Sequence, residues 1–207
     1  MLELRRTFAA CAGRSDRSVW SDDHVRRDLP LDRFRDDCGF VWQRRVFNLP
    51  VTYLLTWLYL ESQVHGELLR HLGEDDLFGC QVTTLGEHRM SRDLLDSLCE
   101  IAFLERMSGG LDGKRILDIG AGYGRLAHRL VCARPSIGRI PCADEIPESS
   151  FLCEFYLRFR GVDHRATTVP LPLIDDELHA AGVISDRSGW ISTDIKQCGD
   201  IEGAPYR

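Results

Sequence analysis

Residues 115–127 read Arg115-Ile116-Leu117-Asp118-Ile119-Gly120-Ala121-Gly122-Tyr123-Gly124-Arg125-Leu126-Ala127, and this stretch decides the fold. Apolar residues surround one acid, Asp118, as is typical of a buried strand. Three glycines at alternate positions follow, and glycine tolerates positive φ and lets the backbone pass close to a ligand. The helix predicted behind them offers free N–H groups and a partial positive charge. The stretch therefore predicts a site for a nucleotide-like cofactor, with a purely structural turn as the competing interpretation.

The spacing of the glycines separates two kinds of cofactor. Dinucleotide-binding loops follow G-x-G-x-x-G, and counting from Gly120 the third glycine would fall on Arg125. Asp118 suits a cofactor with a cationic amine and no pyrophosphate, which fits S-adenosyl-L-methionine. We expect Asp118 to hold its ammonium group, directly or through water. The backbone at Gly120, Ala121 and Gly122 would approach the methionine part, and Gly124 is a further candidate for binding the cofactor.

A second acid lies at a suitable distance from this loop. Asp144 follows Gly124 by 20 residues (144 − 124) and closes the apolar run Ile140-Pro141-Cys142-Ala143. In a βαβ unit this places a carboxylate at the tip of the second strand, where a ribose lies. We expect Asp144 to bind the ribose hydroxyls. Glu145 is a competing candidate, and both are also explained as ordinary loop acids.

Similarity to known proteins extends over three segments, residues 91–97 (SRDLLDS), 120–128 (GAGYGRLAH) and 144–161 (DEIPESSFLCEFYLRFRG). They resemble the bacterial sugar O-methyltransferases, a family of S-adenosylmethionine-dependent class I methyltransferases. The similarity runs from about residue 77 to about residue 173. It implies O-methylation of a sugar or a related small acceptor. The catalytic residues are unknown, because His128, His164 and His179 each have a simpler surface or packing role.

The elements predict an α/β fold, a Rossmann-like methyltransferase core with a partial parallel sheet behind an N-terminal helical cap. We place strands at 114–119, 139–143 and 165–169, and helices at about 123–132 and 147–161. Pro141 lacks an N–H, so its strand is expected at an edge or a bulge. Residues 183–195 contain no sustained apolar run, so no fourth strand is expected. A truncated, non-catalytic remnant is therefore the alternative function.

The chain divides into four expected parts: an Arg/Asp-rich, partly disordered arm at 1–48, a helical cap at 49–110, the partial core at 111–182 and an irregular tail at 183–207. In the arm we expect a solvated surface with a short helix around 31–40. In the cap we expect one helix from Pro50 to about residue 72, an extended piece at 81–85, and a second helix capped by Ser91 and ended at Gly109.

The composition of the chain bears on which partners it can bind and on where in the cell it is expected. The net charge of −6 argues against nucleic acid. The longest apolar run, residues 51–60, is about half a membrane span, so no membrane role is indicated. Eight cysteines form no C-x-x-C pair, which indicates no metal site and reduced thiols in the cytoplasm. A small-molecule acceptor is the expected partner, and the edge of an incomplete sheet would permit self-association. A nucleotide-dependent oxidoreductase is the third, weaker hypothesis.

Overall fold

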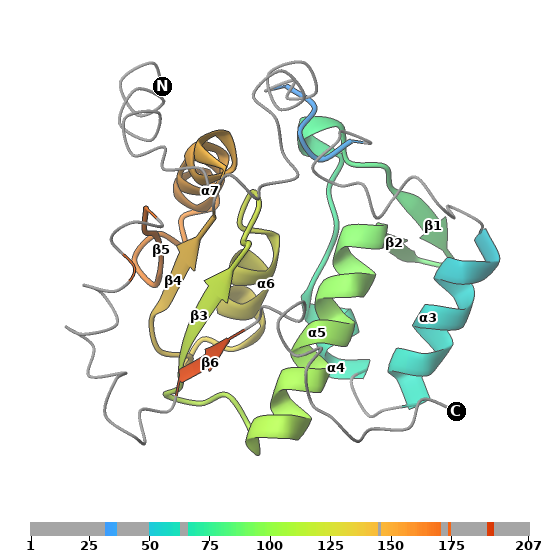
Figure 1. Ribbon diagram of the computed structural model, residues 1–207. Helices are drawn as coiled ribbons and strands as arrows, with labels where there is room; N and C mark the ends of the chain where they lie inside the picture. Colours follow the sequence, from blue (N-terminus) through green and yellow to red (C-terminus); the bar gives the residue numbers. More distant parts are fainter. Residues whose placement is uncertain are drawn as a thin grey trace, which may run out of the picture.

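The computed structural model describes residues 32–36, 50–62, 66–144, 146–170, 174 and 190–192. Four parallel strands form the central sheet: β3 (Arg115–Ile119), β4 (Ile140–Ala143), β5 (Ala166–Thr168) and β6 (Trp190–Ser192). Their order is β5-β4-β3-β6 (Figure 1). Numbered by appearance this is 3-2-1-4, the order of the first four strands of the doubly wound Rossmann fold. The predicted α/β, Rossmann-like class is confirmed by this topology.

The fourth strand corrects the prediction that no strand follows residue 182. β6 pairs with β3 in parallel, with Ile116 opposite Ile191 and Leu117 opposite Ser192. A strand of three residues is too short to show the alternation over four to eight residues by which strands are recognised. Its position follows from the ladder with β3, which is a non-local contact. The remainder of 183–207 lies outside the described residues.

Pro141 also differs from expectation, because β4 is an interior strand and its register shows no bulge. The Ile140 N–H donates to the Arg165 carbonyl at 2.9 Å, and the Cys142 carbonyl accepts from the Val169 N–H at 2.8 Å, so both face β5. Position 141 therefore faces β3, where proline cannot donate. The β3–β4 register accordingly contains only the pairs Asp118–Cys142 and Ile119–Ala143. Proline therefore leaves out one hydrogen bond between β3 and β4. The loop after β3 adds two others, because the amides of Gly120 and Ala121 both donate to the Ala143 carbonyl at the end of β4.

Two helices connect β3, β4 and β5. α6 (Arg125–Ala133) joins β3 to β4, and α7 (Pro147–Phe159) joins β4 to β5 and packs against both of those strands. Both were predicted within about two residues. α7 buries Phe151, Leu152 and Tyr156, in line with the predicted aromatic face. Buried large side chains of this kind stabilise the fold by roughly 1.5–3 kcal/mol each.

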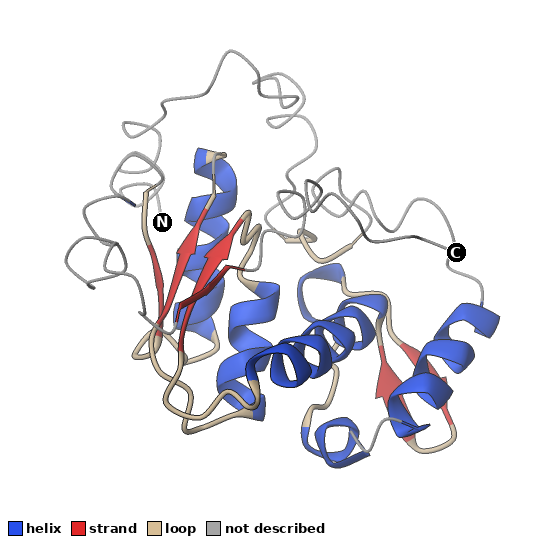
Figure 2. Cartoon of the chain, turned by 60° about the horizontal axis from the view of Figure 1, so that its bottom comes forward, coloured by secondary structure: helices blue, strands red, loops and turns tan. Residues whose placement is uncertain are grey.

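The cap lies beside α6, with α5 between the sheet and the outer elements (Figure 2). It contains α3 (Pro50–Ser62), α4 (Gly66–His71), the short 3₁₀ turn Leu77–Gly79, the hairpin β1 (Thr83–Leu85) and β2 (His88–Met90), and α5 (Arg92–Ser108). The predicted helix over 50–72 corresponds to α3 and α4, with residues 63–65 outside the described part. The strand β2 was not predicted.

The predicted ends of α5 are confirmed. The Ser91 Oγ accepts the Leu94 N–H at 3.0 Å, and Gly109 adopts the left-handed conformation with φ of 69°. The apolar face of α5 joins the cap to the sheet in one hydrophobic cluster. Among the members of that cluster, Leu98 and Ile101 of α5, Leu130 of α6 and Ile116 of β3 are fully buried. The cap is thus part of the same core as the sheet.

Candidate cofactor site

The glycine loop leaves β3 at its carboxyl end and turns into α6. Gly120, Gly122 and Gly124 all have positive φ, at 74°, 57° and 83°. Amides of Gly120 and Ala121 both donate to the Ala143 carbonyl, at 2.8 and 3.1 Å, and so bind the loop to the end of β4. Backbone hydrogen bonds to the end of β4 therefore hold the loop in place.

The glycines of the loop differ in what surrounds them. A Cβ on Gly124 would lie 3.0 Å from the Cys153 Sγ and 3.2 Å from the Leu157 side chain, so this glycine lets α7 pack closely. A Cβ on Gly120 or Gly122 would meet nothing within 4 Å in the part of the chain that the structure describes. Gly120 and Gly122 thus border open space, where a ligand can approach the backbone.

Asp144 lies against the loop, as its spacing predicted. One carboxylate oxygen accepts the Gly122 N–H at 2.9 Å and the other accepts the Ile146 N–H at 2.8 Å. The structure therefore places a carboxylate between the glycine loop and the start of α7. Glu145, the competing candidate, lies outside the described residues.

Asp118 occupies the fourth position of β3, opposite Cys142. Its side chain is buried, with 4% of its surface exposed. The predicted roles of Asp118, Gly120, Ala121, Gly122, Gly124 and Asp144 in binding a cofactor remain predictions.

Tyr123 and Arg125 tie the loop to the first turns of α5. The Tyr123 hydroxyl donates to the Asp93 carboxylate. Burial raises the pKa of Tyr123 well above its ordinary value, and the charge of Asp93 adds to this effect, so the hydroxyl stays a donor. The Arg125 guanidinium donates to the Ser97 Oγ at 2.8 Å and pairs with the Glu100 carboxylate at 2.9 Å.

The three segments that carry the sequence resemblance meet here. Residues 91–97 contact 120–128 through these bonds, and 120–128 contact 144–161 through Asp144 and through the Tyr156 hydroxyl, 3.2 Å from the His128 Nδ1. Burial and the nearby arginines lower the pKa of His128 to about 3, so this imidazole is neutral at physiological pH. Its bond to Tyr156 and its burial indicate a packing role.

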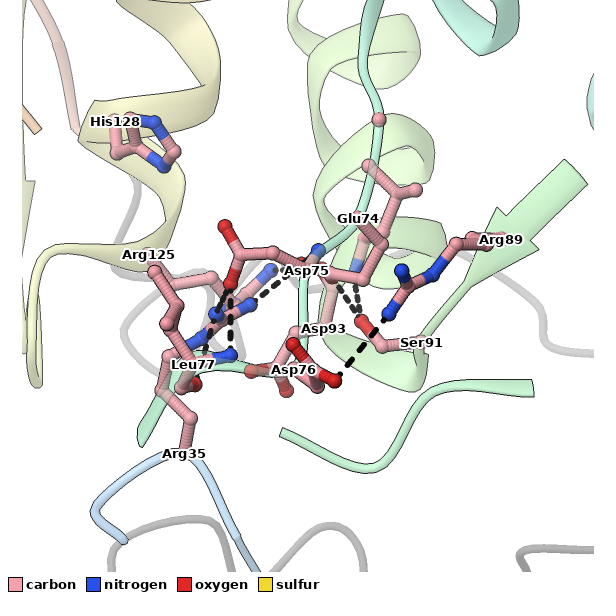
Figure 3. A network of polar contacts seen from close by, with 12 residues as sticks. Arg35, Glu74, Asp75, Asp76, Leu77, Arg89, Ser91, Asp93, Arg125 and His128 are labelled. Carbon is pink, nitrogen blue, oxygen red and sulfur yellow. Dashed lines mark hydrogen bonds and ion pairs between the residues drawn. The ribbon is translucent and has the colours of Figure 1, made fainter. Parts of the chain in front are cut away.

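A buried ionic cluster lies beside the loop, and sequence reasoning missed it. We define the Glu74 cluster as Glu74 with Arg35, Arg129 and Ser91, drawn in part in Figure 3. Glu74 pairs with Arg35 at 2.6 Å and with Arg129 at 2.8 Å, and it accepts a hydrogen bond from the Ser91 hydroxyl. Burial alone would raise the pKa of Glu74, but Arg129, Arg35 and Ser91 outweigh it and lower the pKa.

The cluster shows that part of the stretch expected as a solvated arm, the described residues 32–36, is not wholly solvated. Within the described residues 32–36, Phe34 is 1% exposed and Arg35 is 0% exposed. These five residues form turns, not the helix predicted around 31–40. No local periodicity could reveal their burial, because their partners lie far along the chain. The single signal was Phe34, an aromatic residue among charged ones.

The described part of the chain contains no group of three or more His, Cys, Asp or Glu side chains that could hold a metal ion. Within the same residues, every helix is too short or too polar to cross a membrane.

Comparison with known proteins finds distant likenesses only. No protein-family model and no curated protein matches the chain. A Galdieria sulphuraria structure assigned as a sarcosine dimethylglycine methyltransferase is 21% identical, covering 56% of this chain and 40% of its own, with a TM-score of 0.34. A Klebsiella pneumoniae structure assigned as an O-methyltransferase is 17% identical, covering 72% and 53%, with a TM-score of 0.33.

A Nostoc punctiforme structure, also assigned as an O-methyltransferase, is 17% identical, covering 56% of this chain and 34% of its own, with a TM-score of 0.26. The chain spans less than two thirds of the length of each of these three structures. Similarities this distant do not decide the function of the chain.

Proposed function

We propose that this chain binds S-adenosylmethionine at the carboxyl end of β3 and β4 and transfers its methyl group to a hydroxyl of a sugar or a related small acceptor. The observation that carries the proposal is the hydrogen bond from the Gly122 N–H to the Asp144 carboxylate, at 2.9 Å. It joins a glycine loop with open space beside it to an acid at the tip of the next strand. The sugar acceptor rests on the sequence resemblance alone.

The topology supports a ligand at this place. In doubly wound sheets, ligands bind outside the carboxyl ends of the strands, where the strand order reverses. Here the order reverses at β3, which has β4 on one side and β6 on the other. The N-terminus of α6 also lies there, and its free N–H groups favour a negative group such as a carboxylate. S-adenosylmethionine carries one.

The residues divide the work of binding. Gly120 and Gly122 give the cofactor access to the backbone, Asp118 attracts the ammonium group, and Asp144 receives the ribose hydroxyls. The bound cofactor supplies a methyl group on a sulfonium ion. The protein's main contribution is to hold the acceptor oxygen in line with that methyl group. His128 is unsuitable as the general base, because its pKa of about 3 makes it a weak proton acceptor.

Isothermal titration of the chain with S-adenosylmethionine, and with NAD as a control, tests the proposal. We expect saturable binding of S-adenosylmethionine alone. Asp144→Ala should weaken it at least tenfold, because hydrogen bonds to a charged group contribute about 1.5–3 kcal/mol. Asp163→Ala is the matched control, since Asp163 is an exposed acid in the turn before β5.

Binding of NAD instead would favour the oxidoreductase hypothesis. A folded chain that binds neither compound would contradict the proposal and favour the non-catalytic remnant. If S-adenosylmethionine binds, methyl transfer to a panel of monosaccharides and nucleotide sugars tests the acceptor class.

A further inference from the structure

Tyr123 lies inside the glycine loop, yet residues outside the loop hold its side chain. Its hydroxyl donates to Asp93 of α5. Its ring makes edge contacts with Tyr156 of α7 and with Phe34, at centroid distances of 5.1 and 5.4 Å. Because Tyr123 stands between Gly122 and Gly124, the conformation of the loop depends on these contacts.

Phe34 is the contact that comes from farthest along the chain. Its ring stacks on Phe78 at 4.6 Å and meets Tyr156 edge-on at 5.9 Å. Together with Tyr123, Phe151 and Leu152 it belongs to a hydrophobic cluster separate from the main core. Phe34 is 1% exposed, and burying its ring removes apolar surface from water, which helps to hold this short segment in place.

Arg35 anchors the same segment by charge. Its guanidinium pairs with Glu74 at 2.6 Å and with Asp75 at 2.7 Å, and its backbone N–H donates to the Phe78 carbonyl at 3.0 Å. The neighbouring Arg33 points outward, with 62% of its side chain exposed, and pairs with Asp36. The segment thus presents one arginine to the interior and one to the solvent.

We infer that residues 32–36 form a closing segment, whose docking on Tyr123 and the binding of S-adenosylmethionine stabilise one another. Phe34 and Arg35 are its positioning residues. A cofactor that fixes the backbone of Gly120 and Gly122 also fixes Tyr123, on which Phe34 docks. In the other direction, docking of Phe34 on Tyr123 fixes the conformation of the loop. Such coupling is reciprocal, so each event strengthens the other by the same factor. The inference rests on the proposed function, because it concerns the same cofactor site.

Titration of three variants tests the effect of the segment on the cofactor. For Arg35→Ala and Phe34→Leu, we expect the Kd for S-adenosylmethionine to rise by about 5–150-fold, the usual range for coupled sites. Phe34→Leu keeps an apolar side chain and removes the ring contacts, so it remains informative if Arg35→Ala fails to fold. Arg33→Ala is the matched control and should bind as the unchanged chain does.

Hydrogen exchange tests the effect of the cofactor on the segment. The amide of Arg35, bonded to the Phe78 carbonyl, should exchange more slowly at saturating S-adenosylmethionine, by up to the factor seen in the Kd. A merely structural role would weaken binding in the variants without slowing this exchange. The amide of Val162, bonded to the Leu157 carbonyl at the far end of α7, serves as the internal reference.

The outcomes separate this inference from the proposed function. If the unchanged chain binds no S-adenosylmethionine, both the proposed function and the closing segment are overturned. If it binds, while folded Arg35→Ala or Phe34→Leu keeps its affinity or the Arg35 amide exchanges at the same rate, only the closing segment is overturned. Weaker binding by both variants together with slower exchange in the unchanged chain supports it.

Discussion

The glycine loop and the Glu74 cluster lie side by side, but they are built in different ways. The loop is held by backbone N–H groups and by Asp144, 22 residues from Gly122. The cluster is held by side-chain charges whose partners lie 39 and 55 residues from Glu74, at Arg35 and Arg129. The loop's geometry therefore follows from glycine conformation and a fixed spacing, whereas the cluster depends on which distant charges the fold brings together.

Because the two regions are built differently, substitutions in them should affect different properties of the protein. A change at Gly120 or Gly122 should act mainly on ligand binding, because these two glycines border open space. A change in the Glu74 cluster should lower stability, because it removes part of the charge that balances buried groups.

Glu74→Gln should produce a large loss of stability. It removes a counter-charge shared by two buried arginines, Arg35 and Arg129, and breaking a buried ion pair costs about 3–5 kcal/mol. The free energy of unfolding in urea at pH 7 measures the effect. Glu105→Gln is the control, because Glu105 pairs with the partly exposed Arg134 and should cost about 1 kcal/mol or less. Equal losses in the two variants would remove the contrast between the regions.

Gly124→Ala and Gly120→Ala compare two positions within the loop. Both residues have positive φ, and forcing alanine into that region costs about 1–3 kcal/mol. Gly124→Ala should lose roughly 1–3 kcal/mol more through overpacking, because its Cβ would crowd Cys153 and Leu157. Urea unfolding measures the difference.

The same pair should differ in ligand binding. Gly120→Ala places its Cβ in the open space beside the loop, so it should weaken S-adenosylmethionine binding without the added loss of stability. If Gly120→Ala proves the less stable of the two, the separation of packing from ligand access is wrong.

His128→Asn should change how stability depends on pH. The folded pKa of His128, about 3, is below its ordinary value of 6.5, so between these values the unfolded chain binds the proton that the folded chain does not. Stability is therefore lost as pH falls below 6.5, by up to about 1.4 kcal/mol per pH unit. Asparagine does not titrate and can still bond to the Tyr156 hydroxyl. Unfolding measured from pH 7 to pH 4 should show a flatter curve for the variant, and identical slopes would exclude His128 as the source.

The local sequence pattern was sufficient to predict most elements of the sheet and the helix α5. The apolar run of β3, the glycine spacing and the Ser91 cap each act within a few residues, so their physical meaning can be read directly. The sequence also predicted that Asp144 would lie at the tip of β4. Its bond to Gly122 follows from the βαβ geometry, in which neighbouring parallel strands end at the same edge of the sheet.

Other features depended on contacts between distant residues. β6 has three residues and is defined by its ladder with β3. Pro141 was expected at an edge or a bulge, but strands on both sides of β4 place it inside the sheet, and the register shows no bulge. Among 26 basic residues, nothing in the sequence around Arg35 distinguishes it from Arg33, which lies two positions away and faces solvent.

The sequence by itself determined the α/β class, the strand, glycine loop and helix that form the candidate site, and the acid that lies beside them. These follow from backbone conformation and short-range spacing. Only the tertiary structure decided that Phe34 and Arg35 are buried, that Glu74 contacts two arginines and a serine, and that a short fourth strand lies beside β3. Those features arise from ion pairs, ring contacts and ladder bonds between residues far apart in the chain, whose energies depend on a burial that local sequence does not reveal.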